Sequence, residues 1–197
     1  MLLDLEQSFE ELKELKLAKF LVLPINSSID KFEAKITKFK FPVWIKLNTS
    51  EHKLSLGAVK KASSYEELIK THQEFKKKFP DKKFVIQENI SGIHIIVGIK
   101  HDETFGKILL IGAGGSSVEE KKDIEFRSLP IGKEEISQVL SQLKVYKTIK
   151  NLALTNLVDL IEKISKLKII EADFNPVIVN DKDAFIVDAR LEIEHED

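Results

Sequence analysis

The 197-residue sequence contains no cysteine, which excludes disulfide bonds, thiolate catalysis and zinc sites built on cysteine. It has no apolar run near the roughly 18 residues that a membrane-spanning helix needs. Its N-terminal stretch is acidic and lacks the apolar segment of a signal peptide. Basic and acidic residues nearly cancel, 31 against 32, so charge gives no argument for nucleic acid or membranes. We therefore expect a cytoplasmic protein that binds neither.

Arginine is also scarce, because Arg127 and Arg190 are the only two among the 31 basic residues. The planar guanidinium grips a carboxylate or phosphate with two parallel hydrogen bonds, which lysine cannot do. One interpretation is that each arginine is kept for a specific contact. The other is chance, which two residues do not exclude.

Helical and strand patterns are mixed along the chain. Up to residue 88, helices such as the one expected over residues 4–16 alternate with short strands such as those over 20–23 and 84–88. A strand-rich stretch, two helices and closing strands follow, the last of them over 184–188. This order favours an α+β fold with two lobes. We expect a small lobe over residues 1–88, including an N-terminal helical segment, and a larger lobe over residues 89–197. A cleft between two lobes is a common place for a ligand.

Six of the eight glycines lie between Gly92 and Gly115, and three of them follow a predicted strand as Gly112-Ala113-Gly114-Gly115. Glycines let backbone N–H groups converge on phosphate oxygens. The run is neither a Lys-containing P-loop nor a dinucleotide-binding fingerprint. This pattern alone is compatible with two interpretations, a phosphate-binding loop and a simple hairpin turn.

Carboxylate and amide side chains gather near the C-terminus. Glu171, Asp173 and Asn175 alternate along an extended segment and should share one face, and Asp188 lies on the next predicted strand. Such oxygen ligands suit Mg²⁺, which takes one or two carboxylates together with substrate phosphates. We favour a metal site over a solvated sheet face, because apolar residues flank the polar ones on both sides.

Three further features point to a phosphorylated ligand. Lys46 lies in an apolar strand and needs a phosphate or carboxylate partner if it is buried. Arg127 follows the glycine run and could hold a phosphoryl group, or form a surface ion pair. The polar run Gln87-Glu88-Asn89 ends a strand at the expected hinge, where it could bind an adenine edge and a ribose.

Taken together, these motifs resemble the ATP-grasp β subunit or domain of the ADP-forming acyl-CoA synthetases. The resemblance spans about residues 40–192. Its most specific parts are residues 112–127 (GAGGSSVEEKKDIEFR) and the pair of segments 171–176 (EADFNP) and 187–190 (VDAR). The other matches are Lys46, His52-Lys53, Gly57, Val59, Gln87-Glu88, Val97-Gly98 and Phe105-Gly106.

The resemblance implies an ATP-grasp fold that holds Mg-ATP or Mg-ADP between two lobes. It implies the interconversion of acyl-CoA, ADP and phosphate with acid, CoA and ATP, by way of an acyl-phosphate and a phosphohistidine. In the family the phosphohistidine belongs to a CoA-binding α subunit, or to the same chain in fused forms. For this chain the resemblance implies a separate α subunit and hence a hetero-oligomer.

Residue by residue, the resemblance puts Lys46 at the ATP phosphates and the hinge residues near the nucleotide, namely Gln87, Glu88, Asn89 and Ile90. Gly114 and Gly115 would border the phosphate path, and Arg127 would stabilise the transferring phosphoryl group. His52 matches a loop histidine that passes phosphate between subunits. Asn175 and Asp188 would hold Mg²⁺, with Glu171 or Asp173 in support.

Four features differ from the family's pattern. The loop between Lys46 and His52 is about two residues shorter, Ala58 replaces a glycine, His94 stands where glutamate is usual, and Ser116-Ser117 replaces an apolar pair. Two alternatives therefore stay open. One is another ATP-grasp ligase, such as a succinyl-CoA synthetase β-like chain. The other is a diverged regulatory or non-catalytic subunit.

Overall fold

The computed structural model describes residues 1–51, 53, 55–114 and 123–194, which divide into two compact units. The first unit comprises Ala18–Asn89 with Asp4–Glu6. The second comprises Ile90–Asp197 with Met1–Leu3 and Gln7–Leu17. Most of the N-terminal helical segment, expected in the first lobe, therefore groups with the second unit.

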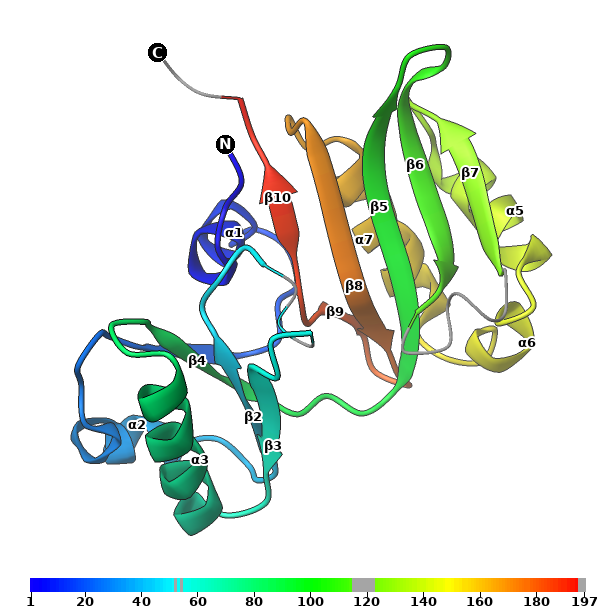
Figure 1. The fold of residues 1–197 in the computed structure, drawn as a ribbon. Helices are drawn as coiled ribbons and strands as arrows, with labels where there is room; N and C mark the ends of the chain where they lie inside the picture. The colour runs from blue at the N-terminus through cyan, green and yellow to red at the C-terminus, as the bar shows by residue number, and fades with distance from the viewer. Residues whose placement is uncertain (52, 54, 115–122, 195–197) are drawn as a thin grey trace. The chain divides into compact units, whose positions relative to one another are not determined.

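The first unit is a four-stranded antiparallel sheet with helices on one face (Figure 1). Its strands lie in the order β1-β4-β2-β3, namely Phe20–Leu23, Phe84–Glu88, Val43–Leu47 and Val59–Ala62. Its helical elements are η1 (Ile29–Phe32), α2 (Glu33–Ile36) and α3 (Tyr65–Lys78). The buried cluster of this unit joins Val43, Ile45 and Leu47 of β2 to Leu68 and Phe75 of α3. The alternate residues of β2 consequently face away from α3.

Helix α3 begins and ends where its sequence dictates. The Ser64 hydroxyl accepts a hydrogen bond from Glu67 N (3.2 Å), and the Glu67 carboxylate accepts one from Ser63 N (2.7 Å). These reciprocal bonds satisfy backbone donors that the first helical turn leaves free. Pro80 follows two residues after the last helical residue and prevents continuation. The helix covers one face of the sheet and leaves the other face for other contacts.

The second unit is built on a six-stranded antiparallel sheet with path β10-β8-β5-β6-β7, and β9 pairs with β8. The strands are β5 (Ile93–Asp102), β6 (Gly106–Ala113), β7 (Ile124–Ser128), β8 (Glu171–Val179), β9 (Ala184–Ile186) and β10 (Arg190–Glu192). The helices are α1 (Leu5–Glu11), α5 (Lys133–Gln142), α6 (Tyr146–Ile149) and α7 (Leu154–Ser165).

Helices α5 and α7 lie against one face of the second sheet (Figure 1). On that face Ile95, Val97 and Ile99 of β5 are fully buried, and the paired Ala172 and Phe174 of β8 are almost so. The intervening residues of each strand point to the opposite face, which we call the bare face. None of the helices in the described residues is long and apolar enough to cross a membrane.

Candidate functional site

In the first unit, the sheet face opposite α3 carries Lys46 and Trp44. Lys46 is only 4% exposed, so this cation is almost completely shielded from water. Trp44 Nε1 donates a hydrogen bond to the Asn89 side-chain oxygen (3.0 Å), and Lys61 Nζ lies 5.8 Å from the centre of the indole ring. The face therefore combines an aromatic ring with two cations, a set that suits a flat, anionic ligand.

Gln87 belongs to the same face, because its register partners on the neighbouring strands are Trp44 and Phe20. Its side chain is fully buried, yet neither amide atom has a hydrogen-bond partner among the described residues. A buried amide without partners costs free energy. The arrangement leaves two donor hydrogens and two acceptor sites of the amide for a ligand group.

The other hinge residues are already engaged. Glu88 Oε1 accepts a hydrogen bond from Lys19 N (2.6 Å), and Glu88 N donates to Lys19 O (2.9 Å). Asn89 holds the Trp44 indole, and Ile90 begins the second unit. Gln87 differs from these hinge residues in that, among the described residues, both of its side-chain polar atoms are buried without a hydrogen-bond partner.

In the second unit, β8 presents its polar residues on the bare face. Ala172 and Phe174 are buried, whereas Glu171 and Asp173 are half-buried and Asn175 is exposed. This alternation agrees with the expectation that the three polar residues share one face. Asp173 pairs with Arg190 of β10, and Glu171 pairs with Glu192, so charged residues line both strands there.

Asp188 lies in the link between β9 and β10, so the predicted bounds of a strand over 184–188 are wrong, because the strand ends at Ile186. Pro176 explains the interruption, because proline has no N–H to donate to a neighbouring strand. Its carbonyl still accepts a hydrogen bond from Val187 N (3.2 Å), which keeps the link beside β8.

The link keeps the register of the two strands that it joins. On one side of it Val177 pairs with Ile186, and on the other Asp173 pairs with Arg190. Two residues inward from either pair, Asn175 and Asp188 are opposite one another. An amide and a carboxylate oxygen at the same level of the sheet suit a Mg²⁺ ion that also binds phosphate.

The described residues hold no group of three or more His, Asp or Glu side chains able to bind a metal ion. Glu171 and Asp173 therefore do not complete a carboxylate cluster with Asp188. Mg²⁺ typically keeps several waters and uses only one or two protein carboxylates beside phosphate oxygens. One amide and one carboxylate, those of Asn175 and Asp188, fit this coordination preference of Mg²⁺.

The glycine run lies in the same row of the sheet. Gly112 pairs with Ile96, and Ile96 falls at the register shift of β5 beside Asn175 and Pro176. Two strand spacings, about 10 Å, therefore separate Gly112 from the Asn175 backbone. Gly114 N donates to His94 O (2.8 Å), and a Cβ on Gly114 would lie 2.8 Å from the Ile95 carbonyl carbon. The backbone is thus held close to β5 at a point that only glycine permits.

Arg127 is not brought together with the Asn175–Asp188 pair. Its register partner is Leu109, which is buried under the helices, so its side chain lies on the helix-covered face. The guanidinium donates to Gln142 Oε1 on α5 (2.8 Å) and to Glu125 Oε2 (3.1 Å). These contacts favour a role in holding β7 against α5, and contact with a phosphoryl group stays a prediction.

Two predicted residues, His52 and Gly115, lie outside the described residues. Two further residues escaped the sequence analysis. Trp44 was read only as part of an apolar strand, although its spacing of two residues from Lys46 puts both on one face. The motif around Asp123 does not indicate that this residue is only 6% exposed or that its carboxylate accepts two backbone hydrogen bonds. The sequence around Asp123 does not reveal these hydrogen bonds, because their donors lie about twenty residues further along the chain.

The structure has two units, each built on a β-sheet, and each sheet has a face with polar groups that suit a nucleotide. Residues 18–193 match the family model of the ATP-grasp domain. The chain belongs to the ATP-grasp family.

Within that family, the chain is similar to ADP-forming acetate–CoA ligases. It is 31% identical over 164 residues to "Acetate--CoA ligase [ADP-forming] II" of Archaeoglobus fulgidus, a match covering 77% of this chain and 24% of that protein. It is 30% identical over 152 residues to "Acetate--CoA ligase [ADP-forming] II subunit beta" of Pyrococcus furiosus, covering 62% of this chain and 64% of that one. The chain thus spans about a quarter of the first curated relatives that it matches.

Solved structures share the fold over almost the whole chain. A protein from Pyrococcus horikoshii superposes with a TM-score of 0.86 at 26% identity, covering 99% of this chain and 92% of that one. A dinucleotide-forming acetyl-coenzyme A synthetase from Ca. Korarchaeum cryptofilum, in complex with coenzyme A and Ca-AMPCP, gives a TM-score of 0.84 at 23% identity. That match covers 98% of this chain and 93% of that one.

Proposed function

We propose that this chain is the nucleotide-binding subunit of an ADP-forming acyl-CoA synthetase. The reaction is acyl-CoA + ADP + phosphate ⇌ acid + CoA + ATP. The observation that carries the proposal is the opposition of Asn175 and Asp188 on the bare face of the second sheet. It is supported by the names of the relatives, several of which are ADP-forming acetate–CoA ligases.

In this proposal Asn175 and Asp188 hold Mg²⁺, which would bridge phosphate oxygens and neutralise their charge. Lys46 binds the phosphates as a point charge from the interior of the first unit. Gln87 offers its amide donor and acceptor to the edge of a nucleobase, which would satisfy the buried polar atoms that lack partners. Phosphoryl transfer depends mainly on such positioning and charge stabilisation.

The proposal includes a partner, a CoA-binding α subunit that carries a phosphohistidine. Relatives named as β subunits support a separate partner. A solved neighbour from Ca. Korarchaeum cryptofilum was determined with Mg-AMPPCP and a phosphohistidine segment directed towards the nucleotide site. We propose that the assembly acts in the cytoplasm, as the sequence led us to expect.

Calorimetric titration of ADP and ATP into the purified chain, with and without Mg²⁺, tests the first half of this proposal. We expect binding that depends on Mg²⁺. The tagged chain should then be purified from its own cells with whatever remains bound, and assayed for ATP formation from acetyl-CoA, ADP and phosphate. Nucleotide binding without ATP formation in that assembly would favour the non-catalytic alternative. Absence of binding in both preparations would overturn the proposal.

A further inference from the structure

Asp123 joins three elements at one point of the second unit. Its carboxylate accepts hydrogen bonds from Lys144 N (2.7 Å) and Val145 N (2.9 Å), in the turn between α5 and α6. Its main-chain oxygen accepts a third bond, from Ala113 N at the end of β6 (2.9 Å). The carboxylate is nearly inaccessible to solvent, so these backbone donors replace the water that it gives up.

The hydrogen bonds of Asp123 help to fix the backbone of Gly112–Gly114, the part of the glycine run that the structure describes. A Cβ on Gly112 would lie 2.6 Å from Asp123 O, so Asp123 packs directly on the Gly112 backbone. Next in the chain, Ala113 is bonded to Asp123, and Gly114 is bonded to His94 O. The path of Gly112–Gly114 is thus held between β5 on one side and Asp123 on the other.

This path lies in the row that leads across β5 to Asn175 and Asp188. Because the α5–α6 turn fixes the carboxylate, a change in that turn would be passed to the backbone of the glycine run. Small displacements of groups that position a substrate have large effects on binding and rate.

We propose that Asp123 is a positioning residue that sets the path of Gly112–Gly114 for the phosphates of a bound nucleotide. The inference rests on the proposed function, and it assigns Asp123 no contact with the nucleotide.

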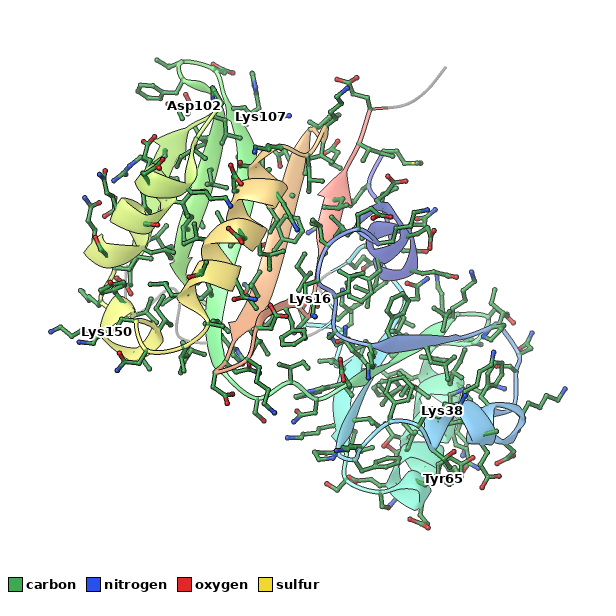
Figure 2. All side chains as sticks on the ribbon, turned by 180° about the vertical axis from the view of Figure 1, so that it is seen from behind. Lys16, Lys38, Tyr65, Asp102, Lys107 and Lys150 are labelled. Atoms are coloured by element: carbon green, nitrogen blue, oxygen red, sulfur yellow. The ribbon has the colours of Figure 1, made fainter. Side chains whose placement is uncertain are left out.

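The same unit offers a matched control in Asp102. Asp102 Oδ1 also accepts two backbone hydrogen bonds, from Thr104 N and Phe105 N (both 2.9 Å), and these bonds hold the pKa of Asp102 below its usual range. Figure 2 shows Asp102 and Lys150, the residue after α6, at opposite ends of the unit. Like the carboxylate of Asp123, that of Asp102 therefore accepts two backbone hydrogen bonds, but it lies at the other end of the unit from the end of α6.

The experiment compares Asp123→Asn with Asp102→Asn in the full chain, by calorimetry with Mg-ADP and by amide hydrogen exchange. Asp123→Asn should weaken Mg-ADP binding about tenfold or more and speed exchange at Ala113 and Gly114. Asp102→Asn should leave the Mg-ADP affinity within about twofold, as surface substitutions usually do. Equal affinities in the two variants would overturn the inference.

Two further results keep the test decisive. If Asp123→Asn does not fold, Asp123→Glu keeps the charge one methylene further out, and the same losses are expected in weaker form. If the unchanged chain binds no Mg-ADP, the proposed function fails first. Exchange at Gly114 then decides this inference separately, because unaltered exchange in the folded variant would show that Asp123 does not hold the run.

Discussion

The register of β9 and β10 against β8 places Asp188 at the level of Asn175, across a break in the strand ladder. One register pairs β9 and β10 with β8 on both sides of the three-residue link, so the link does not shift Asp188 out of line. The hydrogen bond from Val187 N to Pro176 O holds the link at this level. The break therefore interrupts the regular backbone pairing at Asn175 and Asp188, while the common register keeps the two residues at the same level of the sheet.

The first prediction concerns this pair. Asp188→Ala should remove the Mg²⁺ dependence of ADP binding and weaken Mg²⁺ affinity at least about tenfold, the loss that even outer contacts of a metal site cause. Calorimetric titrations at several Mg²⁺ concentrations measure it. Asp181→Ala, which removes an exposed carboxylate from the β8–β9 turn, is the control. A variant that still responds to Mg²⁺ like the unchanged chain would contradict the assignment.

Gln87 leads to a prediction in which stability and affinity move in opposite directions. Gln87→Leu removes two buried polar atoms that lack partners, so the free chain should gain up to about 1–3 kcal/mol of unfolding free energy. The same change removes the hydrogen bonds proposed for the nucleobase, so nucleotide affinity should fall. Thermal unfolding with and without Mg-ADP measures both effects.

Gln138→Leu, at an exposed position on α5, is the control for the added apolar side chain. It should alter neither quantity appreciably. A loss of stability in free Gln87→Leu would indicate that the amide has partners in the protein, and its availability to a ligand would then be ruled out.

For Arg127, the contacts predict a structural loss. Arg127→Ala removes the bonds to Gln142 and Glu125 and should lower the free energy of unfolding by about 1 kcal/mol, the usual size for a partly exposed polar contact. Mg-ADP affinity should stay within about twofold of the unchanged chain. Urea unfolding and calorimetry on the same preparations measure the two quantities. A large loss of phosphoryl transfer at unchanged stability would instead support the phosphoryl contact implied by family resemblance.

His72 predicts a dependence of stability on pH. Its side chain is buried on α3 against Phe84, and burial lowers the pKa of His72 below 6.5, with a smaller contribution from Lys76. The unfolded chain therefore takes up a proton at a pH where the folded chain does not. The free energy of unfolding should have its full value above about pH 6.5. It should decrease as the pH falls towards the pKa of His72 in the folded chain, by at most about 1.4 kcal/mol per pH unit.

Urea unfolding at pH 8 and pH 5.5 measures this effect, and His72→Gln should reduce the difference between the two. Partial desolvation also lowers the pKa of His94, but His94 on the bare face keeps more contact with water than the buried His72. His94→Gln is therefore the control, and it should keep most of the acid sensitivity. Equal acid sensitivity in His72→Gln and the unchanged chain would remove His72 as the cause.

The sequence predicted local structure best where neighbouring residues decide it. Strands over 20–23 and 84–88 were predicted with the bounds that they have, because turn or proline residues end continuous apolar runs there. The N-terminal helix was predicted over 4–16 but is confined to Leu5–Glu11. Beyond it the chain packs against distant strands, as the bridge from Leu17 to Ile186 shows, and helical spacing alone does not reveal such contacts.

The same division holds for the candidate site. Alternation by itself determined that Glu171, Asp173 and Asn175 share a face, because the period of two is a property of any extended chain. Only the tertiary structure decided that Asp188 is the residue opposite Asn175, that Arg127 lies on the other face of the same sheet, and that the Gln87 amide is left without partners. Register, sheet face and burial depend on pairing between segments far apart in the chain, and residue type and local spacing carry no information about that pairing.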